Sequence, residues 1–177
     1  MPRADAARNR ARLLDAAADA FAAGGEVTLE KVARDAGVGI GTLYRHFPTR
    51  ETLVEAVYRN ELEALCRDLD IRPDAATGFR AWLDRYAEFV LTKRGMADTF
   101  RAMVADGSLA SLRTRESVDA AVGTFLTAGA ADGSLRPGIE PDDLVTLLVG
   151  TFVTMQDVDD RARTARLLDL VVCAARP

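Results

Sequence analysis

The chain has 177 residues, of which 49% are hydrophobic, and its formal net charge is −4. A chain of this length suits one compact unit or two small ones, and the absence of an apolar run of about 18 residues or a signal-peptide pattern argues against a membrane protein and favours a soluble, cytoplasmic one. Its two cysteines, Cys66 and Cys173, stand on separate apolar patterns without metal-ligating neighbours, so we expect no disulfide and no metal site.

The first predicted element is an amphipathic helix over residues 6–23. Its apolar residues recur at helical spacing, and the pair Gly24–Gly25 ends the pattern. The residues expected to face inward are Leu13, Leu14, Ala17, Ala20 and Phe21. This helix is expected to form one wall of a small N-terminal domain over residues 1–48.

Basic residues gather near the N-terminus although the whole chain is acidic. Residues 1–50 contain eight Lys or Arg and six acidic residues, which gives this part a charge of +2 and the remainder −6. Four arginines precede most of the acids: Arg3, Arg8, Arg10 and Arg12. They either reach the phosphates of a nucleic acid or form a solvated tail, and the sequence leaves both readings open.

Residues 28–36 predict a short helix that ends in a tight turn. Thr28 is a good N-cap, because its hydroxyl can accept from a free backbone N–H of the first turn, and Glu30 suits the positive end of the helix dipole. Gly37 suits the left-handed conformation that ends a helix, and the small Ala33 lets a second helix cross closely.

A second short helix follows and stops before Pro48. Val38, Leu43 and Phe47 are expected to point inward, which leaves hydroxyl, aromatic and basic side chains on the outer face. Pro48 disfavours helical geometry at the preceding residue. Two helices joined by a tight turn predict a helix-turn-helix whose second helix enters the DNA major groove.

The glycines of residues 37–41 have a rival interpretation as a dinucleotide-binding loop. Such a loop needs Gly-X-Gly-X-X-Gly between a strand and a helix, but Thr42 stands where the third glycine is required. The preceding segment is also helical in pattern. The helix-turn-helix is therefore strongly favoured.

The run GTLYRHFPTR over residues 41–50 resembles the signature of the TetR-type family of bacterial transcription regulators. The close resemblance covers about residues 11–57. It implies an all-α fold, with an N-terminal three-helix DNA-binding domain followed by a larger helical ligand-binding and dimerisation domain over residues 49–177. It also implies contacts with phosphates or base edges of double-stranded operator DNA from Thr28, Thr42, Tyr44, His46 and Arg50.

Three further residues of the same helix complete the expected DNA-binding set: Ile40, Gly41 and Arg45. Arg45 stands at a variable place in the family run. Gly39–Ile40 is a departure, since many members have Ser-Lys there, which puts a phosphate contact at that place in doubt. The alkyl group of Ile40 is instead suited to contact with a thymine methyl group.

Residues 49–69 predict a helix of about 30 Å, at 1.5 Å per residue, that connects the two domains. Polar residues 70–74 form a linker, after which helices are expected over residues 75–94, 96–105 and 111–131. Large aromatic and methionine side chains in this part are more often plain core, but the resemblance suggests that some line an effector pocket. The residues assigned to it are Trp82, Tyr86, Phe100, Met103, Phe125 and Met155.

The last two predicted helices, residues 141–155 and 158–175, are apolar on more than one side. An internal core would explain this pattern, and so would a symmetric dimer interface. The family resemblance points to a four-helix bundle between two subunits. The residues assigned to that homodimer interface are Leu144, Leu148, Gly150, Leu167, Leu168 and Val171.

These features together predict a regulator, with a repressor released from a palindromic operator by an apolar or aromatic small molecule as the expected form. An enzyme is disfavoured, because His46 is the only histidine and no Gly-X-Ser-X-Gly elbow occurs. No cofactor is expected. His46 itself is as well suited to a structural bond as to a phosphate. A helical adaptor that binds protein rather than DNA remains a third reading.

Overall fold

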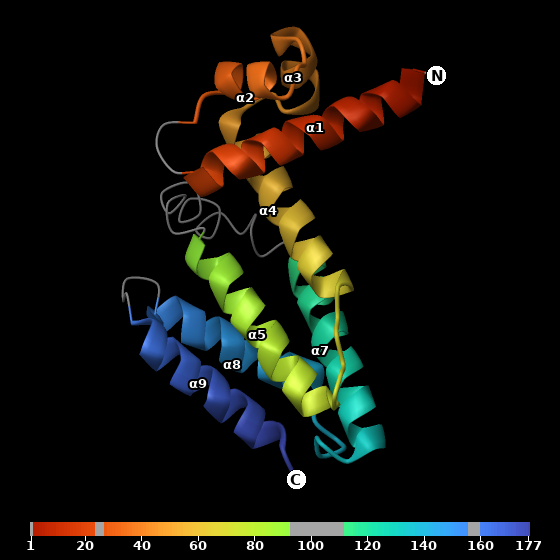
Figure 1. The fold of residues 1–177 in the computed structure, drawn as a ribbon, viewed down its shortest axis with the longest axis vertical. Helices are drawn as coiled ribbons and strands as arrows, with labels where there is room; N and C mark the ends of the chain where they lie inside the picture. The colour runs from red at the N-terminus through yellow and green to blue at the C-terminus, as the bar shows by residue number, and fades with distance from the viewer. Residues whose placement is uncertain (1, 24–26, 93–111, 156–159) are drawn as a thin grey trace. The chain divides into compact units, whose positions relative to one another are not determined.

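The computed structural model describes residues 2–23, 27–92, 112–155 and 160–177, which form helices and connecting segments without a strand (Figure 1). The all-α prediction is therefore confirmed for this part of the chain. The helices are α1 (Pro2–Ala23), α2 (Leu29–Asp35), α3 (Ile40–His46), α4 (Arg50–Arg67), α5 (Ala75–Thr92), α7 (Leu112–Asp132), α8 (Pro141–Met155) and α9 (Arg161–Ala175). Outside the described residues lie the predicted helix 96–105, with Phe100 and Met103, and the predicted stop Gly24–Gly25.

The chain divides into two compact units. Of the described residues, those up to Glu61 belong to the first unit and those from Leu62 onward belong to the second. Helix α4 therefore begins in the first unit and ends in the second. The domain boundary at residue 48 stays a prediction about where the DNA-binding domain ends.

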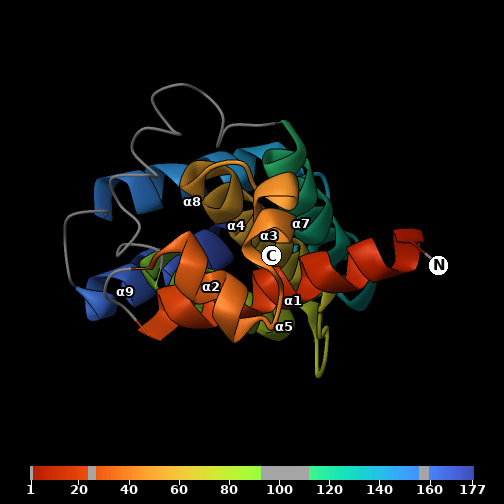
Figure 2. The same cartoon turned by 90° about the horizontal axis from the view of Figure 1, so that it is seen from above.

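The first unit is built on mutual contacts of α1, α2 and α3, which Figure 2 shows from above. Its centre consists of aliphatic side chains that are fully buried: Leu13, Val32, Leu43 and Leu53 are each 0% exposed. Phe21 is only partly buried at the edge of this core. Burial of a leucine contributes about 1.5–3 kcal/mol, so these contacts can hold α2 and α3, which have seven residues each and would not persist alone, against the longer α1.

The second unit is a bundle in which α5 packs against α7 and α9, and α8 also packs against α7 and α9. Large rings fill its centre, with Phe79 and Phe125 at 0% and Trp82 at 2% exposed. Within this unit, Gly78 of α5 is required by packing, because a Cβ there would stand 2.2 Å from the carbonyl oxygen of Asp70.

The N-terminus of α5 is capped by the last residue of α7 and by a residue that follows it. The Asp132 carboxylate accepts from the Ala75 N–H at 2.8 Å, and the Ser134 hydroxyl accepts from the Ala76 N–H at 3.1 Å. Bonds from Ser134 and then from Ala75 lower the pKa of Asp132 below its ordinary value. This cap fixes the start of α5 against the end of α7.

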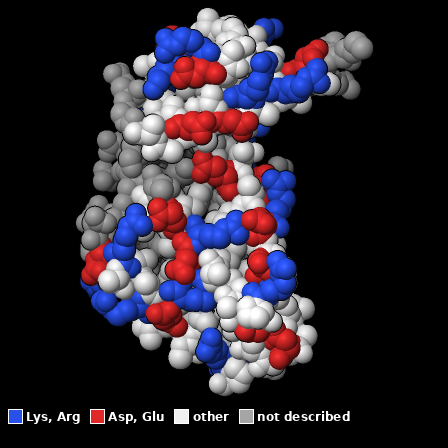
Figure 3. All heavy atoms as spheres, in the orientation of Figure 1, with Lys and Arg blue, Asp and Glu red and all other residues white. Residues whose placement is uncertain are grey.

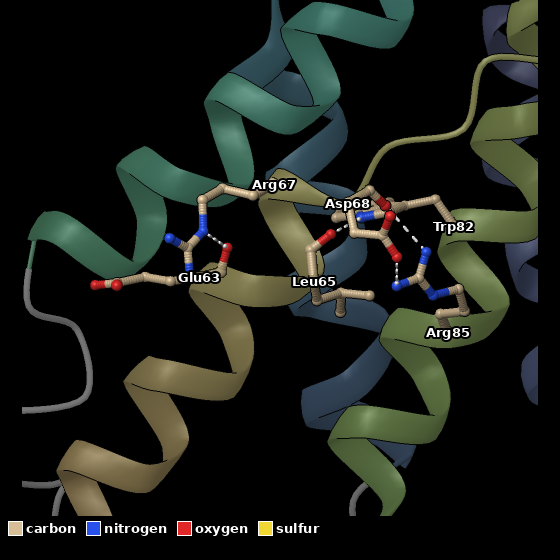
Figure 4. A network of polar contacts seen from close by, with 6 residues as sticks. All are labelled: Glu63, Leu65, Arg67, Asp68, Trp82 and Arg85. Carbon is tan, nitrogen blue, oxygen red and sulfur yellow. Dashed lines mark hydrogen bonds and ion pairs between the residues drawn. The ribbon is translucent and has the colours of Figure 1, made fainter. Parts of the chain in front are cut away.

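The end of α4 is tied to α5 by polar contacts (Figure 4). The Trp82 indole N–H donates to the Leu65 carbonyl at 3.1 Å, and Arg85 donates to the Asp68 carbonyl at 3.0 Å and to its carboxylate at 2.7 Å. Arg67 turns back to the Glu63 carbonyl within α4 itself. The last turn of α4 is thus fixed to the aromatic centre of the second unit.

No helix in the described ranges is both long and apolar enough to cross a bilayer.

Candidate nucleic-acid interface

Helix α2 and the turn after it have the predicted caps. Thr28 is extended, and its hydroxyl accepts from the Lys31 N–H at 3.2 Å. Gly37 has φ of +62°, the left-handed region, and the Val38 N–H donates to the Ala33 carbonyl at 2.9 Å. The turn therefore sets the entry of α3 without a distorted side-chain-bearing residue.

Helix α3 presents two different faces. Val38, Leu43 and Phe47 are 9%, 0% and 3% exposed, so the side expected to point inward does so. On the outer side, Ile40 is 40% and Tyr44 is 45% exposed, one turn apart. The core contacts hold the outer face in place, which is the requirement for reading a groove with a helix of only seven residues.

Arg45 is folded along its own helix. Its Nε donates to the Gly41 carbonyl at 3.1 Å, and its Nη2 donates to the Thr42 hydroxyl at 2.9 Å. A hydroxyl that accepts from a guanidinium has its own proton directed elsewhere. The Thr42 hydroxyl thus serves as an acceptor for Arg45 and keeps its proton for another bond.

His46 and Arg50 lie at the far end of α3 and the start of α4. His46 is half-buried, with its ring 6.2 Å from that of Phe47. The Arg50 guanidinium lies over the Phe21 ring at 5.7 Å, and its Nε donates to the Val27 carbonyl at 3.4 Å. Arg50 thus stabilises the fold of the first unit as well as carrying charge.

The basic residues of α1 divide into two groups. Arg10 lies over the Phe47 ring at 5.5 Å, and an Arg12 nitrogen lies 4.0 Å from where a Cβ would stand on Gly37. Arg8 is paired with Asp5. Figure 3 shows basic side chains along the N-terminal half of α1 and near α2 and α3, with acidic ones between them. Arg10 and Arg12 are therefore held beside the helix-turn-helix.

The described residues of the expected effector pocket are all buried in the second unit. Trp82 stacks on Tyr86 at 5.3 Å between ring centroids and lies 6.0 Å from Phe125. Tyr86 also meets Phe152 edge-on at 5.4 Å, and Met155 is 2% exposed. The structure thus brings these side chains into one aromatic cluster. The sequence did not identify Phe152 as a member of this cluster, although it falls within the apolar pattern of α8.

The six residues expected at a dimer interface separate by burial. Leu144, Leu148, Leu168 and Val171 are at most 5% exposed and pack inside the second unit, whereas Gly150 is exposed and Leu167 is half-buried. The exposed large hydrophobic side chains described in this unit lie on α8 and α9: Leu147, Val149, Val153 and Leu170. The dense apolar residues of α8, and the mostly apolar run from residue 167 to residue 172 of α9, concealed which residues face outward.

Two family comparisons cover most of the chain. Residues 13–57 match the family described as "Bacterial regulatory proteins, tetR family", and residues 74–174 match "Transcriptional regulator SbtR-like, C-terminal domain". The TetR regulator SCO0520 of Streptomyces coelicolor is 42% identical, over 95% of this chain and 98% of that chain, with a TM-score of 0.72. A TetR regulatory protein of Mycobacterium vanbaalenii is 29% identical over 100% of both chains, with a TM-score of 0.68.

Curated relatives match over a shorter length. The HTH-type transcriptional regulators TtgW and SrpR, both of Pseudomonas putida, are each 37% identical over 81 residues, or 45% of this chain. That match spans 58% of TtgW and 37% of SrpR. The two family matches agree with the solved relatives, which cover 95% and 100% of this chain. The chain belongs to the TetR family of bacterial transcriptional regulators, whose N-terminal helix-turn-helix binds DNA.

Proposed function

We propose that this regulator is a homodimeric repressor that binds a palindromic operator and leaves it when an apolar or aromatic small molecule binds the second unit. The observation that carries the proposal is the outer face of α3, where Tyr44 is 45% exposed and the exposed Arg45 lies beside the Thr42 hydroxyl, to which it donates. A donor, a ring and a cation on a rigid helix are the equipment of direct readout in the major groove.

A second copy of the chain completes the reading surface. One short helix contacts only a few base pairs, so two copies on two half-sites supply the missing specificity. The copies are proposed to meet through the exposed apolar side chains of α8 and α9, with Gly150 allowing close approach. We place the interface on Leu147, Gly150, Val153, Leu167 and Leu170, because Leu144, Leu148, Leu168 and Val171 are already buried in their own unit.

The aromatic cluster around Trp82, with Tyr86, Phe125 and Met155, is the proposed effector site. A ligand that separates the rings would also strain the bond from Trp82 to the Leu65 carbonyl (Figure 4). That carbonyl belongs to α4, which begins in the first unit. Differential affinity of the ligand for two positions of α4 would then lower operator affinity.

The test is selection of bound sequences from a random duplex library with the purified full chain. The expected result is a palindrome, whose half-site spacing reports the dimer. Binding should weaken steeply as salt rises, because several phosphates are neutralised. A library from which nothing is recovered, with and without metabolite extract, would overturn the proposal and favour a helical adaptor.

Effector release is tested separately on the recovered operator. Small apolar and aromatic compounds are screened for loss of the protein–DNA complex. Phe125→Ala is expected to change the response to a hit while operator binding without the compound persists, if the variant still folds. Tyr86→Phe is the milder companion, since it keeps the ring. If a compound releases the operator from both variants as readily as from the parent, it binds at another site.

A further inference from the structure

Ile40 differs chemically from the other exposed side chains of α3. It is the first residue of that helix and is 40% exposed, while neighbouring outward groups on α3 carry hydroxyl or guanidinium donors. A β-branched side chain that is partly exposed at the start of a helix contributes little to stability. Only part of it is buried, and the helix propensity of isoleucine is modest.

Glycines flank Ile40 without a steric need in the described part of the chain. A Cβ on Gly39 or Gly41 would meet no atom within 4 Å. Gly39 has φ −63° and ψ 139°, a conformation open to any residue, and its missing side chain leaves the N-cap of α3 without a side-chain hydrogen bond. The result is a bare backbone from which the Ile40 side chain projects.

The floor of the major groove offers one apolar partner for such a group. Each base edge there carries hydrogen-bond donors or acceptors, and the apolar group among them is the C5-methyl of thymine. An alkyl group pressed against adenine, guanine or cytosine edges would remove water from polar atoms without replacing its bonds, which is unfavourable. A thymine methyl has no such cost.

We infer that Ile40 reads the C5-methyl of one thymine in each operator half-site, a specificity that rests on the proposed function. Gly39 and Gly41 permit the backbone approach that this contact requires. Tyr44, one turn further along α3, lies on the same outer face. The proposal therefore fixes one base pair of the half-site as T·A, with the thymine toward the N-terminus of α3.

The test replaces thymine by uracil in the selected operator, one symmetric pair of positions at a time. Uracil keeps every hydrogen-bonding atom and lacks only the methyl group. At one pair of positions the full-length protein is expected to lose about fourfold in affinity per half-site, about 0.8 kcal/mol for one buried methyl, and about 15-fold for both. Cytosine with and without a C5-methyl at the same place forms a second arm, in which the methyl should recover affinity.

Variants assign the effect to the side chain. Ile40→Ala is expected to bind thymine and uracil duplexes equally at that position, and Ile40→Val to keep most of the discrimination. Lys31→Ala, on the neighbouring α2, is the matched control. It should keep the parent's full ratio of affinities for the thymine and uracil duplexes, whatever its overall affinity. The thermal midpoints of both Ile40 variants should match that of the parent, because the Ile40 side chain is 40% exposed.

Two failures are distinguishable. Equal binding of thymine and uracil duplexes at every position, or an unchanged ratio in Ile40→Ala, would overturn this inference while the protein still binds its operator. Failure to retain any duplex would overturn the proposed function and this inference with it.

Discussion

At the scale of single residues, Tyr44 separates DNA contact from folding most cleanly. Because its side chain is 45% exposed, Tyr44→Ala should leave the thermal midpoint nearly unchanged. Operator affinity should fall by roughly 1–3 kcal/mol if the ring or hydroxyl meets a base edge. Fluorescence anisotropy with the selected duplex measures the loss, and Tyr44→Phe separates the hydroxyl from the ring. If Tyr44→Ala binds the operator with the same Kd as the parent, Tyr44 does not contact DNA.

Arg50 makes a contrasting case among the expected DNA contacts. Its guanidinium lies over Phe21 and its Nε bonds to Val27, so truncation removes contacts within the first unit. Arg50→Ala is therefore expected to lower both stability and operator affinity, and its loss of binding alone does not identify a phosphate contact. The sequence could indicate Arg50 as basic and close to α3, but not these packing partners.

Gly41 offers an opposite pair of effects on stability and binding. A Cβ at this position of α3 meets nothing within 4 Å, so Gly41→Ala should raise the free energy of unfolding by about 0.5 kcal/mol through a stiffer unfolded chain and better helix propensity. The added methyl should weaken operator binding, if the backbone lies close to DNA. Urea unfolding and anisotropy on the same sample check both. Unchanged operator affinity would mean that the backbone at Gly41 does not lie close to the DNA.

At the scale of helices, the position of Gly78 in α5 could not be read from periodicity. A Cβ there would stand 2.2 Å from the Asp70 carbonyl, whereas a Cβ on Gly123 of α7 meets Pro141 at an ordinary 3.4 Å. Gly78→Ala should therefore destabilise the second unit by at least about 1–3 kcal/mol, as overpacking against backbone does. Gly123→Ala is the matched control and should be neutral or slightly stabilising. Urea midpoints of the two variants compare the sites directly.

The cap on α5 makes stability depend on pH. Because bonds from Ser134 and Ala75 lower the pKa of Asp132 in the folded state, its contribution is present above the ordinary pKa of 3.8 and is lost as pH falls through the lower folded value. Asp132→Asn should therefore destabilise the protein at pH 7 and lose less stability than the parent on acidification. Urea midpoints between pH 7 and pH 3 measure the difference.

Asp119 of α7 should behave in the opposite sense. Burial first, and then the nearby Asp142, raise its pKa, and its Oδ1 has no hydrogen-bond partner among the residues that the structure describes. Asp119→Asn is expected to stabilise the protein at neutral pH. The gain should disappear as pH falls through the raised pKa of the folded state toward the ordinary value of 3.8, because Asp119 of the folded parent takes up its proton first. A variant less stable than the parent at pH 7 would show that the ionised form is favoured.

At the scale of the whole chain, local patterns predicted more than distant contacts. Helix boundaries came from caps and apolar spacing, as at Thr28 and Pro141, and the helix-turn-helix came from a contiguous run of residues. The cap of α5 by Asp132 joins residues 57 apart, and no local pattern signals it. In α8 apolar residues are so dense that their periodicity did not show which face is buried, and Leu144 was assigned to an interface although it is 3% exposed.

The proposed dimer interface can be tested by comparing an exposed and a buried leucine of α9. Leu170 on α9 is 64% exposed, and its neighbour Leu168 is 1% exposed. Leu170→Arg should leave the folded unit intact but place a third cation beside Arg163 and Arg166, which line the same surface hollow on the proposed interface. Sedimentation should then show monomers at micromolar concentration and operator affinity should collapse, because two half-sites are no longer read together.

Leu168→Ala provides the contrast for this experiment. Removal of a buried leucine should lower the free energy of unfolding by about 2–5 kcal/mol through the lost transfer energy and the cavity left behind. The two variants therefore separate folding from assembly: Leu170→Arg should change sedimentation at an unchanged thermal midpoint, and Leu168→Ala should first change the midpoint. A dimer that survives Leu170→Arg with its operator affinity intact would place the contact between copies on some other surface than the exposed residues of α8 and α9.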